Sequence, residues 1–224
     1  ETGRLLQALR SAWAPIGGDA PTRAALELAL TLGLRASEVC AVAWAHVRLD
    51  EEPATLFVAK SKTEAGERIL PLPDAARALL EHLRAGATKP ARQGDKPRPL
   101  PMYVFAAREK AGRAAHLHPE SLSRAFTRAC AALSIDKATL HDLRRTAISG
   151  LGELGFADAI VKRIAGHAGG DVTARHYDKS GRTAAVRAAL ASWSAALESA
   201  ARRAGEASAL PGPIAALTAS EAGQ

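Results

Sequence analysis

The stretch HDLRRTAISGLGELGFADAIVKRIAGHAGGDVTARHY spans residues 141–177 and concentrates side chains that handle phosphate groups. His141 and Arg144 are three positions apart in a helical pattern, so they share one face of the helix and can address one small anion. His167 follows Gly166 at the end of the next helical pattern, and Tyr177 comes ten residues later. A tyrosine near a histidine is ordinary by itself, so the stretch acquires meaning only from the rest of the chain.

The flanking sequence predicts a mainly helical fold around one small antiparallel hairpin. Gly33 ends a helical pattern and places Arg35 at a corner between two helices, the second of which we expect to run from Ser37 through Val47. Two short β-like runs at 54–60 and 68–72 predict the hairpin, with Lys60 and Lys62 near its tip. Apolar periodicity predicts further helices over residues 3–14, 21–33, 74–85, 119–133, 140–154, 158–165 and 183–203.

Between the helices at 74–85 and 119–133, residues 87–116 contain seven Lys or Arg, two acids and four prolines. This composition predicts a basic loop, interrupted by a short strand at 103–105. The apolar face of Val186, Leu190, Trp193 and Leu197 predicts core packing. The alternative is exchange of the C-terminal segment between neighbouring subunits, with the tail near Ile214 and Leu217 docking in trans. We expect one α+β domain over residues 1–204 and a flexible tail over 205–224.

Composition narrows the class of partner. The 224 residues carry a formal charge of +7, which favours a polyanion such as nucleic acid. Two cysteines, Cys40 and Cys130, lie in helical patterns and support neither a disulfide framework nor a cysteine zinc site. With no signal peptide or membrane-length apolar run in the sequence, we expect a cytoplasmic protein with no membrane contact.

Five segments together resemble the successive signature boxes of tyrosine recombinases and phage-type integrases. They are LGLRASEV at 32–39, AKSKTEAGERILPLP at 59–73, LHDLRRTAISGL at 140–151, RIAGHAG at 163–169 and ARHYDKS at 174–180. The boxes follow the family's order at plausible spacings and cover nearly its whole catalytic domain, from about residue 20 to residue 180. The resemblance therefore implies the catalytic-domain fold of this family.

The resemblance also implies a catalytic set, position by position. Arg35 matches the first catalytic arginine, Glu38 an acidic position that often supports it, and Lys62 the hairpin lysine, for which Lys60 is the competitor. His141 and Arg144 match the His-x-x-Arg box, His167 the second histidine and Tyr177 the nucleophile. The step from His167 to Tyr177 is one residue longer than in well-known members, which leaves the length of this loop open.

These residue types suit phosphodiester chemistry. Arginine forks stabilise charge on the non-bridging oxygens, and a tyrosine needs its proton removed before it attacks. The leaving 5′-hydroxyl needs a proton, which we assign to Lys62. Since a phosphotyrosine ester conserves the bond energy, religation needs no ATP, metal or other cofactor. His167 with His176 could suggest zinc, but no carboxylate or cysteine joins them at ligand spacing.

The predicted function is site-specific recombination that integrates or excises a phage or genomic island in a bacterial nucleoid. Two alternatives stay open: relaxation of DNA by a type IB topoisomerase, and a catalytically silent DNA-binding module. The family implies double-stranded DNA as partner, a homotetramer on DNA with the isolated domain a possible monomer, and an N-terminal core-binding domain that is absent from this chain.

Overall fold

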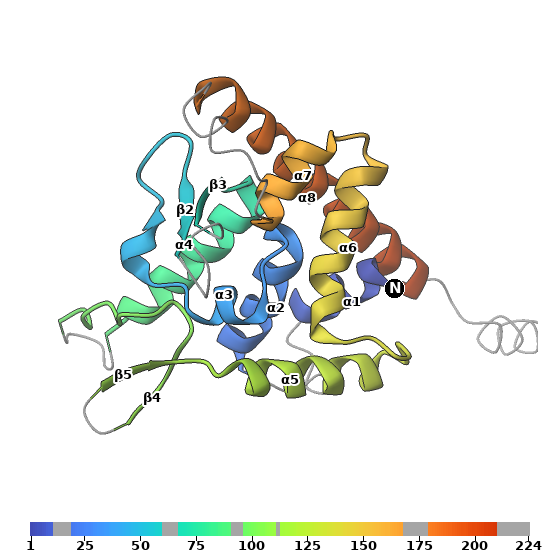
Figure 1. Ribbon diagram of the computed structural model, residues 1–224. Coiled ribbons are helices and arrows are strands. Elements are labelled where there is room, and N and C mark those ends of the chain that lie inside the picture. Colours follow the sequence, from blue (N-terminus) through green and yellow to red (C-terminus); the bar gives the residue numbers. More distant parts are fainter. Residues whose placement is uncertain (11–18, 60–66, 91–95, 111–112, 168–178, 210–224) are drawn as a thin grey trace, which may run out of the picture.

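A computed structural model describes residues 1–10, 19–59, 67–90, 96–110, 113–167 and 179–209. Eight helices form most of the described chain, in the order α1 to α8 (Figure 1). Their bounds are α1 Thr2–Arg10, α2 Ala20–Leu32, α3 Ala36–Cys40, α4 Asp74–Thr88, α5 Pro119–Ala132, α6 Leu140–Glu153, α7 Asp158–Ala165 and α8 Lys179–Ala209. The periodicity of the sequence thus predicts the main helices correctly.

A three-stranded antiparallel sheet lies among these helices, in the order β1-β2-β3. The strands are β1 Val47–Arg48, β2 Thr55–Val58 and β3 Arg68–Pro71. In the predicted hairpin, Leu56 pairs with Leu70 and Val58 with Arg68. Because side chains alternate across a strand, Arg68 and Leu70 face the same side of the sheet, and both are buried.

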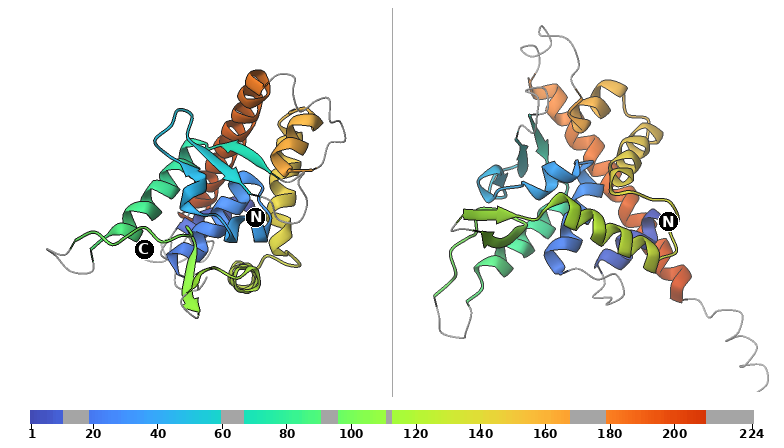
Figure 2. Two further views of the ribbon diagram at one scale, coloured as in Figure 1. Left: turned by 60° about the vertical axis from the view of Figure 1, so that its left-hand side comes forward. Right: turned by 60° about the horizontal axis from the view of Figure 1, so that its bottom comes forward.

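Three expectations for single elements are wrong. The helix after Arg35 ends at Cys40, because Val42 and Trp44 then bond the backbone of Val104 and Met102, and a 3-10 helix Trp44–His46 leads into β1. The expected strand at 103–105 is reduced to one bridge between Tyr103 and Ala43. Instead, a second hairpin forms within the stretch predicted to be a basic loop, from β4 Ala106–Lys110 and β5 Arg113–His116 (Figure 2).

Helix α8 organises the core by contacting α1, α2, α6, α7 and β3. The Trp193 indole donates a hydrogen bond to the Leu30 carbonyl at 3.1 Å, and a Cβ at Gly150 of α6 would overlap its ring. Val186, Leu190, Trp193 and Leu197 are all buried, which confirms the expected core packing. The helix is longer than predicted, so residues 205–209 are helical, and the rest of the expected tail lies outside the described residues.

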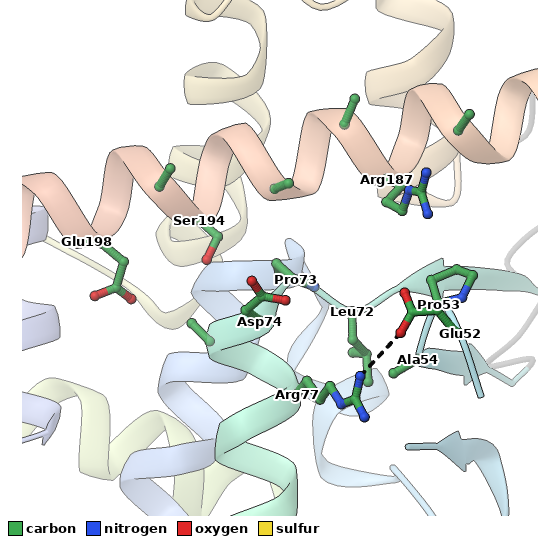
Figure 3. Close-up of a pocket in the computed structure, with 15 residues that line it drawn as sticks. Glu52, Pro53, Ala54, Leu72, Pro73, Asp74, Arg77, Arg187, Ser194 and Glu198 are labelled. Atoms are coloured by element: carbon green, nitrogen blue, oxygen red, sulfur yellow. Dashed lines mark hydrogen bonds and ion pairs between the residues drawn. The ribbon is translucent and has the colours of Figure 1, made fainter. Parts of the chain in front are cut away.

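Figure 3 shows an open cleft of about 500 Å³ between α8 and the start of α4. Its walls mix charges with alanines of α8: Asp74 and Arg77 lie on one side, and Arg187 and Glu198 on the other (Figure 3). Of the expected catalytic residues that the structure describes, Arg35, His141, Arg144 and His167, none lines this cleft. In the part of the chain that is described, no helix combines the length and apolarity needed to cross a membrane.

Candidate functional site

The site begins at the corner between α2 and α3. Gly33 ends α2 in a left-handed conformation with φ of 62°, a backbone state that glycine adopts without steric cost. Arg35 then precedes the first turn of α3, and its backbone N–H donates to the Glu38 carboxylate at 2.9 Å. The Arg35 side chain reaches the same carboxylate, with Nη1 2.7 Å from Oε1. The predicted corner is confirmed, and Glu38 holds Arg35 by both its backbone and its side chain.

A second arginine reaches Glu38 from the sheet. Arg68, the first residue of β3, donates from Nη1 to Oε1 at 3.1 Å and from Nη2 to Oε2 at 3.0 Å. Its Nε donates to the Ile164 carbonyl in the last turn of α7, at 2.8 Å. The side chains of Arg68 and Glu38 are 4% and 2% exposed, so this is a buried, two-pronged ion pair that joins three elements.

Arg144 reaches the same place from α6, and its side chain is 2% exposed. Its Nη1 donates to the Gly33 carbonyl at 2.7 Å, and its Nη2 donates to the Ala165 carbonyl. Both acceptors lie at the C-terminal ends of helices, where carbonyl groups lack partners within the helix. Arg144 also lies 3.8 Å from the Glu38 carboxylate, measured from Nη1 to Oε2.

His167 lies beside Arg144, with Nε2 3.2 Å from Nη2 of the arginine. Burial lowers the pKa of His167, and the positive charges of Arg144, Arg35 and Arg68 lower it further. The ring is therefore neutral at neutral pH. Since an arginine nitrogen can only donate, Nε2 acts as the acceptor, and the ring proton lies on Nδ1.

The electrostatics of this cluster favour an anion. Burial alone would raise the pKa of Glu38, but hydrogen bonds and charge from Arg68, together with hydrogen bonds from Arg35, lower it to about 2. Burial and the charges of Arg35 and Arg68 lower the pKa of Arg144 to about 10, against the effect of Glu38. Glu38 and Arg144 are thus both ionised at neutral pH. Three guanidinium groups, of Arg35, Arg68 and Arg144, lie around this single carboxylate and leave net positive charge at the site.

The structure brings together Arg35, Arg144 and His167 from the expected catalytic set. His141 lies one turn before Arg144 in α6, is exposed, and makes no hydrogen bond or ion pair with these three residues among those described. Lys62, its competitor Lys60 and the nucleophile candidate Tyr177 lie outside the described residues. The shared helical face of His141 and Arg144 therefore does not by itself bring both side chains into one contact network.

Arg68 is the member of the cluster that sequence reasoning missed. Its partners are 30 and 96 positions away in the sequence, so no local motif marks it. A usable signal does exist, because the alternation of β3 places Arg68 on the same face as the buried Leu70. A charged residue on the core-facing side of a strand needs a buried partner.

No group of three potential metal-ligating side chains occurs among the described residues. A second, smaller cleft of about 280 Å³ borders Glu38, and its lining comes from α3, the 3-10 helix Trp44–His46, β2, the end of β5 and the start of α5, including His46, Phe57 and His116. The described chemistry of the cluster is that of an anion site built on arginine.

Comparison with known proteins gives a consistent result. The sequence profile of the phage integrase family matches residues 1–182. No curated protein matches the chain by sequence.

Solved structures share its fold. The integrase from a mycobacterium phage, Brujita, has a TM-score of 0.57 and 19% identity, over 84% of this chain and 56% of that one. The Tn1549 transposon integrase in complex with circular intermediate DNA has a TM-score of 0.56 and 17% identity, over 76% of this chain and 57% of that one. A lambda integrase dimer bound to a core site has a TM-score of 0.53 and 22% identity, over 80% of this chain and 58% of that one. The chain thus spans just over half the length of each of these structures.

Proposed function

Since the chain belongs to the phage integrase family, we propose that it breaks and rejoins double-stranded DNA through a 3′-phosphotyrosine link to Tyr177. The observation that carries the proposal is the cluster of Arg35, Arg144 and His167 around the Glu38 carboxylate. The solved Tn1549 and lambda integrases are bound to DNA, which supports DNA as the substrate.

The arginines are suited to charge that develops during the reaction. A phosphodiester carries one negative charge and gains a second as a nucleophile adds, so donors aimed at its non-bridging oxygens lower the barrier. Arg144 has five N–H donors, and two of its nitrogens bond backbone carbonyls in the resting site. This fixes the plane of the guanidinium before DNA arrives and leaves donors for a phosphate oxygen.

The remaining steps need a nucleophile, a base and an acid. The Tyr177 oxygen bonds to the phosphorus as the bond to the 5′ oxygen breaks, and this oxygen receives a proton from Lys62 and leaves as the 5′-hydroxyl. The proton of the tyrosine is taken with the help of His141, while the Nδ1–H of His167 donates to the phosphate. Attack by a new 5′-hydroxyl on the phosphotyrosine ester then reverses these transfers and rejoins the strand without an external energy source.

The assembly and the biological outcome belong to the same proposal. We expect integration or excision of a mobile element in the bacterial nucleoid, by a homotetramer on DNA. The lambda integrase solved at a core site is a dimer, which supports assembly of several subunits on DNA.

A nicked suicide duplex tests the nucleophile. The chain should form a covalent protein–DNA adduct on this substrate, whereas Tyr177→Phe should fold and bind DNA without forming one. Tyr103, which forms a β-bridge with Ala43, offers a matched control. Tyr103→Phe should form the covalent adduct as well as the wild-type chain does. A chain that binds DNA but forms no adduct would be a silent DNA-binding module, and relaxation of supercoiled plasmid without strand exchange would favour a type IB topoisomerase.

A further inference from the structure

Arg68 occupies a position that packing alone does not require. Its side chain is buried, bonds both oxygens of Glu38 and bonds the Ile164 carbonyl in the last turn of α7. A buried ion pair of this kind is often no more stabilising than a well-packed apolar pair of the same volume. Its location, rather than its contribution to stability, therefore needs an explanation.

Glu38 is shared among arginines that have different tasks. Its Oε1 accepts from Arg35 at 2.7 Å as well as from Arg68 at 3.1 Å. Its Oε2 lies 3.0 Å from Arg68 and 3.8 Å from Arg144. Without Arg68, the full negative charge of this buried carboxylate would fall on Arg35 and Arg144, the two groups assigned to the phosphate.

We propose that Arg68 is a positioning residue that neutralises and orients the Glu38 carboxylate, so that Arg35 and Arg144 keep their charge available for a DNA phosphate. The proposal rests on the strand-cleavage function proposed above. Arg68 acts through Glu38 and does not itself contact the DNA. This role explains why a charged side chain stands at the start of β3 on the same face as buried Leu70.

The backbone around His167 is fitted to the same guanidinium. Gly166 ends α7 with φ of 62°, and a Cβ built on it would lie 2.5 Å from Nη1 of Arg68. Glycine at this position thus provides both the left-handed turn and the space for Arg68. The turn places His167 directly after the contact, so Arg68 links the strand, the α3 corner and the histidine.

A double-mutant cycle separates this role from a structural one. Arg68→Met is close in volume and lacks charge, so it should leave Glu38 free to bind Arg35 and Arg144 and should slow adduct formation about 10²-fold, the usual effect of losing one stabilising group. In Glu38→Gln with Arg68→Met, no carboxylate remains to be neutralised. The double variant should therefore form the adduct at least tenfold faster than Arg68→Met alone. If Arg68 had only a structural role, the double variant would form the adduct as slowly as Arg68→Met or more slowly.

Binding to the same duplex provides a readout that does not depend on cleavage. In Arg68→Met, Glu38 should neutralise one of the two phosphate-binding arginines, Arg35 or Arg144. The slope of log affinity against log salt should then fall by about 0.9, and the double variant should recover it. If the wild-type chain forms no adduct, the proposed cleavage function fails, and the binding slopes still decide the role of Arg68.

Arg10→Met is the matched control, because Arg10 bonds Glu27 and Glu198 in a similar ion cluster between α1, α2 and α8. It should lower the melting temperature and leave both the adduct rate and the slope unchanged. If Arg68→Met does not fold, Glu38→Gln is compared with the double variant, and rates within about threefold support the role. The proposal is overturned if Arg68→Met cleaves and binds like wild type, or if the folded double variant is no faster than the single one and binds with the same reduced slope.

Discussion

Glu38 is a single carboxylate whose ionisation holds three arginines in place. Its pKa of about 2 in the folded chain compares with an ordinary value of 4.5. Because the folded-state pKa is depressed, its contribution to stability is fully present above about pH 4.5 and is lost as the pH falls toward 2. The difference corresponds to about 3 kcal/mol of unfolding free energy.

Urea unfolding between pH 2 and pH 7 measures this contribution. Wild type should lose about 3 kcal/mol from this group across the acid range. Glu38→Gln should be less stable at pH 7, because it leaves the buried Arg68 without its charge partner, but its stability should fall less steeply with acid. Glu51→Gln, at an exposed position, is the control and should follow the wild-type curve. Parallel curves for wild type and Glu38→Gln would contradict the low pKa.

The role proposed for Lys62 is open to a direct chemical test, because in the proposed reaction its proton goes to the leaving group alone. Lys62→Ala should slow cleavage by about 10² to 10⁴. Replacing the bridging 5′ oxygen by sulfur gives a leaving thiolate that needs little protonation, so this substrate should restore most of the rate. Arg35→Ala and Arg144→Ala should not be rescued, since they act on non-bridging oxygens.

Lys60→Ala is the internal control for this experiment and should behave like wild type on both substrates. Rescue of Lys60→Ala in place of Lys62→Ala would move the proton donor two positions along the chain. Rescue of neither variant would place the acid elsewhere.

At the scale of elements, the end of α7 sets the position of His167. Gly166→Ala should cost about 3 kcal/mol of stability, because it combines the left-handed backbone penalty with a clash against Arg68. Gly155 also has positive φ, 83°, but a Cβ there meets nothing within 4 Å. Gly155→Ala should therefore cost only about 1 kcal/mol and keep the adduct rate. Equal losses from the two substitutions, measured by chemical unfolding, would argue against close packing of Arg68 on Gly166.

The helices were predictable because their signals are local. Apolar periodicity with glycine at positions 33 and 166 gives the ends of α2 and α7 within a residue or so. The prolines and charged residues of 87–116 are typical of a loop, so the sequence did not predict β4 and β5. These two strands are held by pairing with each other and show no alternation of apolar residues that would mark them as strands. Long-range partners likewise determine the contacts of Arg68, and its only local signal is its place on the same face of β3 as the buried Leu70.

In the candidate site too, features with local signals were predictable from the sequence, and features that depend on long-range contacts were not. The resemblance to the family's signature boxes singled out Arg35, Arg144 and His167, and the structure places Arg35 and Arg144 at Glu38 and His167 beside Arg144, while their catalytic roles stay a prediction. The expected support of Arg35 by Glu38 is present in the structure. Helical periodicity predicted that His141 and Arg144 share one face of α6. In the structure His141 is exposed, whereas Arg144, one turn further along the helix, is buried. Burial depends on what packs against the helix, which the helical pattern itself does not contain.

For the whole molecule, the net charge of +7 should make the proposed affinity for DNA sensitive to salt. The log-log slope of binding should be about −0.9 per phosphate contacted, as counterions are released from the duplex. EDTA should leave cleavage unchanged, because protein cations and a tyrosine ester carry the proposed reaction. Filter binding across a salt series and adduct assays with a chelator measure the two effects; loss of cleavage with EDTA would instead indicate a metal-dependent step.

The ion pair between Arg10 and Glu198 joins positions 188 apart in the sequence, and α1 packs so closely on α8 that Gly3 lies against Ala200. Closing a loop of this length costs about 2.6 kcal/mol more in chain entropy than closing one of ten residues, since the cost grows as (3/2)RT ln n. Docking of α1 therefore becomes favourable only after the intervening helices have shortened the effective loop. We therefore expect α1 to join the domain late in folding and to leave it early, so its amide protons should exchange with solvent before those of the core, which hydrogen exchange can measure.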